Sequence, residues 1–169
     1  HHYSQGTGTP IRRSATNYDN RGHVYQSLRY SVDPSTGTVG NVLTDNNWYD
    51  PVGNVMMQLP AGSQAFTKSV YDALNRQTVQ YVGFYIGSIS YSQAEDISGA
   101  TIVEQRETAY DEASNVIQTT TRQRFHNATG TGPLTYPGGA QPQARVIYTA
   151  IYPDGIGRGR AIADYGTNG

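Results

Sequence analysis

The chain has 169 residues, with 12 basic and 13 acidic side chains that give a formal net charge of −1. Because this charge is close to zero, it argues against nucleic acid as a partner and against electrostatic attachment to an anionic membrane. No apolar run approaches the ~20 residues of a membrane-spanning helix, and the absence of cysteine excludes disulfides, zinc–thiolate sites and thiol nucleophiles.

Residues 1–16 are expected to form an extended N-terminal arm. This segment contains Gly6, Gly8 and Pro10 and has no hydrophobic pattern, so ordering it requires contacts that offset the lost chain entropy. Residues 17–166 are expected to form one β-sheet region, because 14 tyrosines and 19 glycines in a chain of low charge favour strands and turns. Residues 167–169 are expected to continue as a tail toward a neighbouring repeat or subunit.

A six-residue motif recurs along this region: Tyr, Asp, two variable residues, a turn former and a polar residue. We number these positions 1 to 6. Four copies occupy residues 18–23, 49–54, 71–76 and 110–115, and their marker residues are Tyr18, Asp19 and Gly22; Tyr49, Asp50 and Gly53; Tyr71, Asp72 and Asn75; and Tyr110, Asp111 and Ser114. A degenerate fifth copy, residues 152–158, is read as carrying one inserted residue.

The motif predicts a tight β-hairpin turn. The Asp carboxylate can accept hydrogen bonds from backbone N–H groups two or three residues on, and position 5 requires a positive φ. Glycine adopts that conformation freely and Asn75 tolerates it, whereas Ser114 is a poor fit. The tyrosine before each turn has high strand propensity, and its ring can stack on the ring of a neighbouring hairpin.

The segments between the turns alternate with the period of a strand. Strands are expected at 101–110, 115–125 and 145–152, each with mixed polar and apolar faces. Residues 65–74 are a weak helix candidate, and long loops are expected at 33–40 and 60–64 and in the Gly/Pro-rich segment 130–144. The chain is therefore predicted to be almost entirely β.

The sequences Tyr-Asp-x-x-Gly-Asn at 49–54 and Tyr-Asp-Ala-Leu-Asn-Arg at 71–76 resemble the YD, or RHS, repeat, over about residues 17–166. Such repeats are found in bacterial insecticidal toxin complexes, contact-dependent toxins and teneurins. The resemblance implies antiparallel β-hairpin repeats in a curved strip or shell segment. It also implies an extracellular or cell-surface scaffold that encloses, adheres or binds carbohydrate, with no enzyme activity in the repeats.

Catalytic and metal-binding patterns are not found in the sequence. His23 and His126 are far from each other and from the adjacent His1 and His2, and no His-x-x-x-His pair occurs. Glu104 and Glu107 fall on opposite faces of one predicted strand, unlike a glycosidase pair. No nucleophile elbow or phosphate-binding loop is present. We therefore expect no catalytic residue, no metal site and no cofactor.

An aromatic set allows two interpretations: Trp48, Tyr49, Tyr81, Tyr85 and Tyr91. Flat amphipathic rings can stack on sugars, which would make a carbohydrate platform, or the rings can form the interior ladder of a repeat sheet. Asn127 begins an Asn-Ala-Thr triplet that would accept a glycan in a secretory pathway.

The sequence thus predicts a non-enzymatic structural module of a secreted or cell-surface bacterial protein. Open strand edges at both ends of a hairpin strip need partners, so they must continue into more chain of the same kind or into another copy. The second option predicts a homo-oligomer or filament joined through terminal strands. The alternatives are a carbohydrate-binding module and a fragment of a toxin-encapsulating shell.

Overall fold

The computed structural model describes residues 10–134 and 143–167 of the chain. These residues fall into two compact units, His1–Gln64 and Ala65–Gly169. In both units the described residues form antiparallel strands, and in the second they also form one short helix. The prediction of an all-β fold is confirmed.

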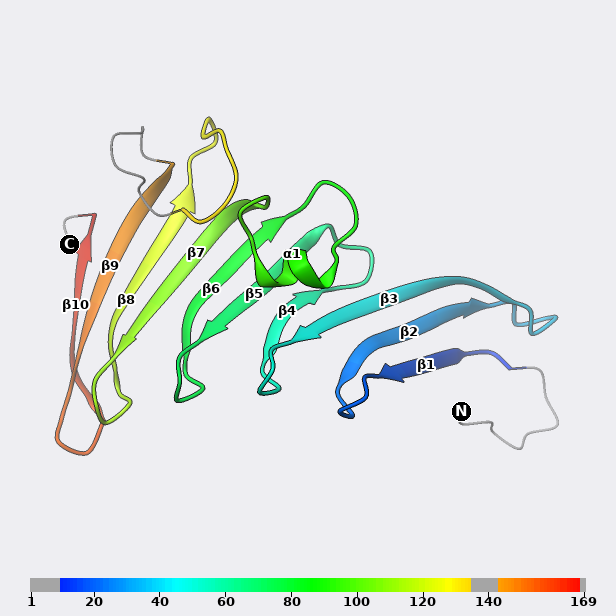
Figure 1. Ribbon diagram of the computed structural model, residues 1–169, viewed down its shortest axis with the longest axis horizontal. Coiled ribbons are helices and arrows are strands. Elements are labelled where there is room, and N and C mark those ends of the chain that lie inside the picture. Colours follow the sequence, from blue (N-terminus) through cyan, green and yellow to red (C-terminus); the bar gives the residue numbers. More distant parts are fainter. Residues whose placement is uncertain (1–9, 135–142, 168–169) are drawn as a thin grey trace. The chain divides into compact units, whose positions relative to one another are not determined.

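The first unit is a meander of four strands, β1 (Arg13–Tyr18), β2 (Val24–Val32), β3 (Val39–Tyr49) and β4 (Val55–Leu59). Each strand pairs antiparallel with the next along the chain. The β1–β2 and β3–β4 hairpin turns lie on the same side of this sheet, where the strands end (Figure 1). Residues 13–16, expected in the N-terminal arm, belong to β1, whereas residues 1–9 lie outside the described part.

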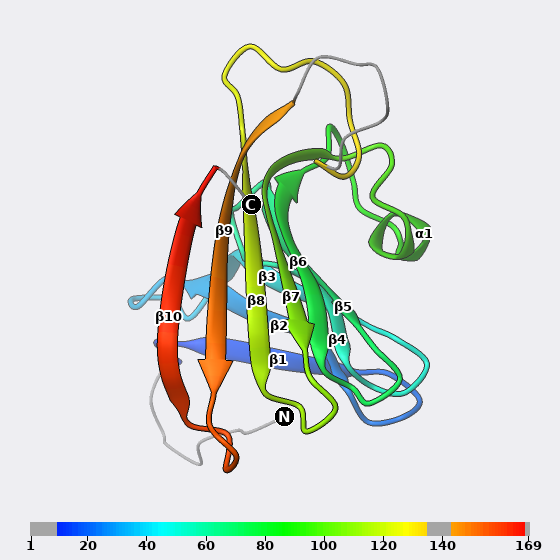
Figure 2. The same ribbon diagram turned by 90° about the vertical axis from the view of Figure 1, so that its left-hand side faces the viewer.

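The second unit continues the same scheme with six strands, which also pair antiparallel in chain order. They are β5 (Ala65–Tyr71), β6 (Gln77–Phe84), β7 (Thr101–Tyr110), β8 (Val116–Arg124), β9 (Ala144–Pro153) and β10 (Gly159–Gly166). The helix α1 (Tyr91–Glu95) stands off one face of this sheet (Figure 2).

The strands agree closely with the sequence pattern, with one exception. The predicted strand 101–110 has the bounds of β7, and the strands predicted at 115–125 and 145–152 correspond to β8 and β9. The helix candidate at 65–74 is wrong, because residues 65–71 form β5. Within the predicted 130–144 loop, residues 135–142 lie outside the described part, and residue 144 already belongs to β9.

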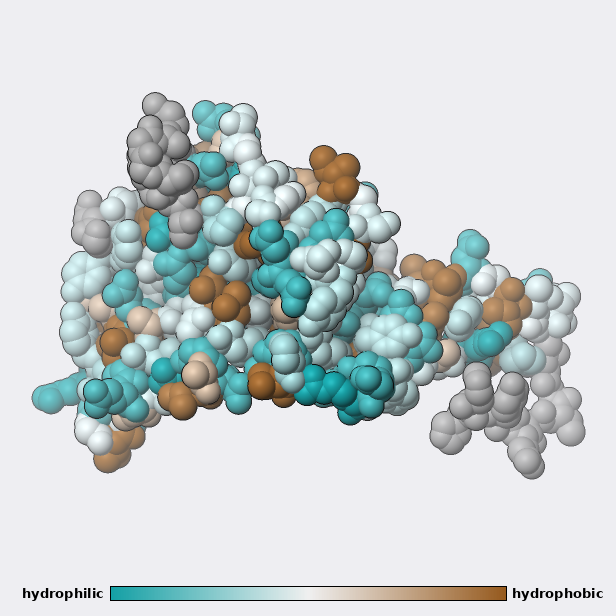
Figure 3. All heavy atoms as spheres, viewed as in Figure 1, coloured by the Kyte–Doolittle hydropathy of each residue, from teal (hydrophilic) through white to brown (hydrophobic). Residues whose placement is uncertain are grey.

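The sheet of the second unit buries one face. Phe66 on β5 and Ile102 on β7 are 1% and 0% exposed, and the Phe66 ring stacks on Tyr85 with the ring centres 5.4 Å apart. Lys68 and Gln105 are buried on the same face. The surface seen in Figure 3 carries hydrophobic side chains in small groups among hydrophilic ones. Such a sheet is packed on one side and wet on the other, which explains the mixed strand faces.

Candidate functional site

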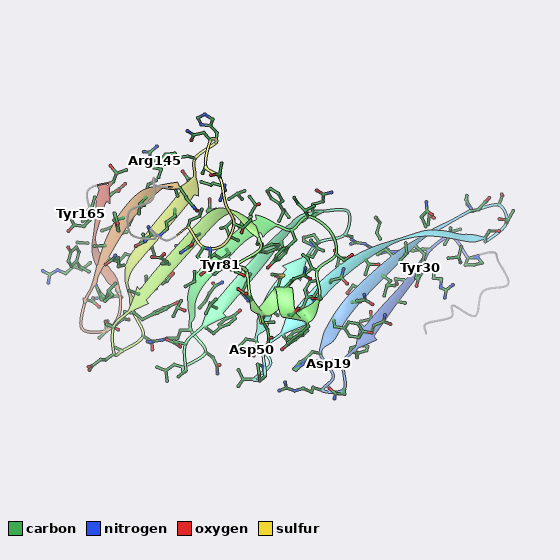
Figure 4. All side chains as sticks on the ribbon, turned by 45° about the horizontal axis from the view of Figure 1, so that its top comes forward. Asp19, Tyr30, Asp50, Tyr81, Arg145 and Tyr165 are labelled. Atoms are coloured by element: carbon green, nitrogen blue, oxygen red, sulfur yellow. The ribbon has the colours of Figure 1, made fainter. Side chains whose placement is uncertain are left out.

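The most regular feature of the described residues is the motif turn, which closes five of the hairpins. Turns 1 and 2 (18–23 and 49–54) belong to the first unit, and turns 3, 4 and 5 (71–76, 110–115 and 153–158) belong to the second. In all of them the Asp N–H donates to the position 6 carbonyl at 2.8–3.0 Å, and the position 5 N–H donates to the Asp carbonyl at 2.9–3.1 Å. Figure 4 labels Asp19 and Asp50, which head turns 1 and 2.

The Asp carboxylate holds each turn from inside. In turn 3, Oδ1 of Asp72 accepts from the N–H groups of Leu74 at 2.9 Å and Arg76 at 3.0 Å, and Oδ2 accepts from Arg76 Nε at 2.7 Å. The donors lie two and four residues on, not two or three as expected. The N–H three residues on is used by the Asp carbonyl instead.

Position 5 has a positive φ in every turn. The values are 85° at Gly22, 98° at Gly53, 59° at Asn75, 67° at Ser114 and 85° at Gly157. Ser114 was expected to fit poorly, yet it adopts this conformation, and its Oγ accepts a hydrogen bond from Arg76 at 3.0 Å. That bond compensates part of the backbone strain.

The fifth copy has no inserted residue. Asp154 occupies position 2, Gly157 position 5 and Arg158 position 6, with the same hydrogen bonds as in the other turns. Pro153 therefore stands where the other copies have tyrosine, and Tyr152 lies one residue before the motif. The predicted insertion is wrong because the Asp and the positive-φ residue, rather than the tyrosine, define the turn.

Within each unit, a position 6 side chain contacts the following turn. Arg76 of turn 3 donates to the Asp111 carbonyl of turn 4 at 3.2 Å, and its guanidinium carbon lies 4.6 Å from the centre of the Tyr110 ring. In the first unit, His23 of turn 1 stacks on Tyr49 at the start of turn 2, with ring centres 4.7 Å apart. Position 6 thus provides the contact surface for the following turn.

Two position 1 tyrosines also bind the preceding hairpin. The Tyr49 hydroxyl donates to the Val24 carbonyl at 2.7 Å, and the Tyr110 hydroxyl donates to the Gln77 carbonyl at 2.9 Å. Both carbonyls belong to the residue that directly follows position 6 of the preceding turn. These tyrosines are therefore structural ties between hairpins.

Alanine substitutions at two glycines with the same φ test how closely the turns pack. Gly22 and Gly157 both have a φ of 85°, but a Cβ on Gly22 would meet no atom within 4 Å, whereas one on Gly157 would lie 2.5 Å from Asn115 Oδ1. We expect Gly22→Ala to cost about 1 kcal/mol from backbone strain alone. Gly157→Ala should cost more, because Asn115 must also move. Equal losses in urea denaturation would contradict a tight contact between turns 4 and 5.

The turn carboxylates also predict acid sensitivity. In turn 3, the backbone N–H of Arg76 lowers the pKa of Asp72; partial desolvation opposes this, and the Arg76 side chain and Leu74 N–H lower it further. The pKa of Asp154 is lowered in the same way, first by the backbone N–H and then by the side chain of Arg158. A depressed folded-state pKa stabilises the fold above the unfolded pKa of about 4, and this contribution is lost as the pH falls through the folded pKa.

Stability should therefore be level near neutral pH and fall below about pH 4. Asp72→Asn removes the titrating group but keeps an oxygen acceptor, so its free energy of unfolding should depend less on pH in this range. Glu112→Gln, which removes an exposed carboxylate of turn 4, is the control. Urea denaturation between pH 2.5 and 7 makes the measurement, and identical slopes for Asp72→Asn and the parent would refute the prediction.

In the second unit, a polar cleft lies beside α1, at the strand ends opposite the motif turns. Lys68, 5% exposed, donates from Nζ to the Ala94 carbonyl and to the Glu95 carbonyl, at 3.1 Å for the latter, and so holds the helix end on the sheet. The Tyr85 hydroxyl lies 2.9 Å from the Gln93 carbonyl and 2.6 Å from the Asp96 carbonyl. The cleft has a volume of about 640 Å³ and is lined by Tyr85, Ile86, Ser92, Gln93, Glu95, Asp96, Ser98, Gly99, Thr101 and Thr131.

The aromatic residues considered for sugar stacking are divided between the units. Trp48 and Tyr49 lie on β3 of the first unit, and Tyr49 is already stacked on His23. In the second unit Tyr81 is half-buried on β6, Tyr85 is buried, and Tyr91 is exposed at the start of α1. Tyr85 is 9% exposed, its ring stacks on Phe66 and its hydroxyl binds the α1 segment. Asn127 is exposed after β8.

Sequence reasoning missed the buried polar residues of the second unit. Gln105 is 1% exposed and accepts from the Leu134 N–H at 2.7 Å, which fixes the loop after β8. Arg122 on β8 forms an ion pair with Glu107 on β7, with Nε 2.8 Å from Oε1. Alternation alone could not show which face of each strand is covered, so these residues could not be distinguished from solvated ones.

The comparisons add no assignment: the sequence matches no family model, and no curated protein is significantly similar to it. Among the described residues, no group of three or more His, Asp or Glu side chains is arranged to hold a metal ion. The same part of the chain contains no helix long and apolar enough to cross a membrane.

Proposed function

We propose that the chain is a structural YD/RHS-type repeat module of a secreted or cell-surface bacterial protein. It acts by joining hairpins edge to edge into an extracellular fibre or scaffold, and it performs no catalysis. The observation that carries this proposal is the contact between turns 3 and 4, in which Arg76 at position 6 and Tyr110 at position 1 bind the two hairpins together. His23 and Tyr49 make the corresponding contact between turns 1 and 2.

The terminal strands β1 and β10 each offer one edge to a further strand. Among the described residues, β1 pairs only with β2, and β10 pairs only with β9. Each therefore has one edge of backbone N–H and C=O groups without a strand partner, which favours addition of a further strand. A net charge of −1 places little long-range repulsion between copies.

The test is the mass and shape of the purified chain over a wide concentration range. Sedimentation and negative-stain electron microscopy should show end-to-end assemblies that lengthen with concentration. Because main-chain pairing rather than charge joins the copies, these assemblies should persist when the salt concentration is raised to about 1 M, where the Debye length is about 3 Å. A chain that is monomeric at every concentration would refute the proposal.

Carbohydrate binding is the second candidate, and the polar cleft beside α1 is the observation that favours it. Hydroxyl, amide and carboxylate groups line this cleft, and they suit the hydrogen-bonding groups of a sugar. Calorimetric titration of neutral oligosaccharides into the chain and into a Gln93→Ala variant makes the test. Binding that the variant weakens would support this function, and the absence of heat from any sugar would count against it.

A further inference from the structure

The last turn of the chain has an unfilled contact surface. Arg158 repeats the arrangement of Arg76 within its own turn: its N–H lies 2.9 Å from Asp154 Oδ1 and its Nε lies 2.8 Å from Oδ2. The Arg76 side chain is 23% exposed because it also binds turn 4. The Arg158 side chain is 76% exposed, and its two terminal nitrogens have no hydrogen-bond partner among the described residues.

The first turn has the complementary unfilled surface. Tyr18 is 61% exposed, whereas the equivalent Tyr49 and Tyr110 are partly buried and tied to a preceding hairpin. A Cβ on Gly22 would point into open space, whereas one on Gly53 would lie 3.1 Å from the His23 ring of the preceding turn. Turn 1 thus has every feature of a turn that receives a position 6 side chain, except the side chain itself.

We propose that turn 5 of one copy binds turn 1 of a second copy. The partner is specified by the internal contact between turns 3 and 4. Arg158 would donate to the Asp19 carbonyl and cover the Tyr18 ring, and the Tyr18 hydroxyl would donate to the Gly159 carbonyl. This inference rests on the proposed function and identifies the residues of the joint.

The strand register of the joint follows from the three internal junctions. In each, the third residue after position 6 pairs with the fourth residue before the next Asp: Gln26 with Asn46, Val79 with Glu107, and Gln118 with Ala150. The same rule applied to β10 and the β1 strand of the second copy pairs Ala161 with Ala15. It also sets Asp164 opposite Arg12, an attractive pair of charges.

The joint joins two different surfaces, so it can repeat without closing a symmetric dimer. The absence of cysteine makes its register measurable, since any disulfide must come from introduced residues. We would mix a copy carrying Ala15→Cys with a copy carrying Ala161→Cys under oxidising conditions. A covalent dimer that grows no further is expected, because paired Cβ atoms lie ~4.5–5.5 Å apart.

The matched control replaces the first copy by one carrying Thr16→Cys, whose side chain points to the other face of the strand. This mixture should give far less dimer. A single chain carrying both Ala15→Cys and Ala161→Cys should give a ladder of covalent multimers.

Side-chain variants test the contact between the turns. Arg158→Ala should raise the concentration at which half the chains are assembled by about tenfold or more, because a charged donor to a carbonyl is removed. Tyr18→Phe should raise it about two- to tenfold, through loss of one hydroxyl. Arg145→Ala, which removes an exposed arginine of β9, is the control (Figure 4). Circular dichroism establishes that each variant folds.

The outcomes separate the joint from the proposed function. Selective cross-linking of Ala15→Cys with Ala161→Cys, together with weaker assembly of Arg158→Ala, supports the joint. If the parent assembles but the Thr16→Cys control cross-links equally, or Arg158→Ala assembles as well as the parent, the joint is wrong and the proposed function stands. A parent chain that never assembles overturns both.

Discussion

Alanine at Gly83 is expected to lower the free energy of unfolding by about 1–3 kcal/mol. Gly83 is buried on β6, and a Cβ there would lie 2.7 Å from the Thr101 carbonyl oxygen and 3.1 Å from the Ile102 Cα. These are backbone atoms of β7, so no rotamer change can relieve the overlap. The adjacent strands must separate instead, which disturbs the pairing above the buried Ile102 side chain.

Gly155→Ala is the matched control for Gly83→Ala. Gly155 lies in turn 5 of the same unit and is exposed, and a Cβ added to it would meet no atom within 4 Å. Its substitution should change the free energy of unfolding by no more than about 0.5 kcal/mol. Urea denaturation followed by circular dichroism compares the two. A Gly83→Ala variant as stable as Gly155→Ala would show that β6 and β7 are not packed this closely.

Replacement of Lys68 by methionine is expected to release the α1 segment and to cost about 1–3 kcal/mol. Burial lowers the pKa of Lys68, and the nearby Glu95 and Asp96 oppose this effect. Methionine has a similar length and avoids the desolvation of a charge, but it leaves the Ala94 and Glu95 carbonyls without their donor. The loss of these bonds outweighs the relief because both carbonyls lie at the end of a short helix.

Hydrogen exchange measured by mass spectrometry locates the effect. Amides of α1 should exchange faster in Lys68→Met than in the parent, while those of β7 keep their protection. Thr67→Ala, which alters the neighbouring residue on the other face of β5, should leave the exchange of α1 unchanged. Unaltered exchange in α1 of Lys68→Met would mean that the tie from Lys68 is not what holds the segment.

The sequence predicts the turns well, because their chemistry is local. An Asp at position 2 and a residue that tolerates positive φ at position 5 suffice for a hairpin. The fifth copy was misread because tyrosine served as the marker, although Pro153 fills that position without disturbing the turn. The contact between position 6 and the following turn could not be predicted, since the partner lies in the next hairpin.

The remaining differences arise from contacts distant in sequence. Residues 65–74 were a weak helix candidate, yet Phe66 and Lys68 alternate with Thr67 and Ser69 along β5, and only the folded sheet reveals which face is covered. Helix α1 itself spans Tyr91–Glu95, which is too short for a helical period to be recognised. The cleft beside it is formed by loops that sequence periodicity cannot place.

The constant register between hairpins has a consequence for how such a chain can change. The motif turns set the strand register. The connections at the other ends of the strands, such as 33–38 between β2 and β3, therefore do not determine this register. Their lengths can then vary without shifting any strand, and the connections after β6 and β8 are the ones that carry α1 and the Gln105-bound loop. A foreign peptide grafted at 34–37 should therefore be displayed between β2 and β3 with the pairing of these strands intact. The hairpin turns are thus fixed in sequence, whereas the connections between hairpins are open to insertion.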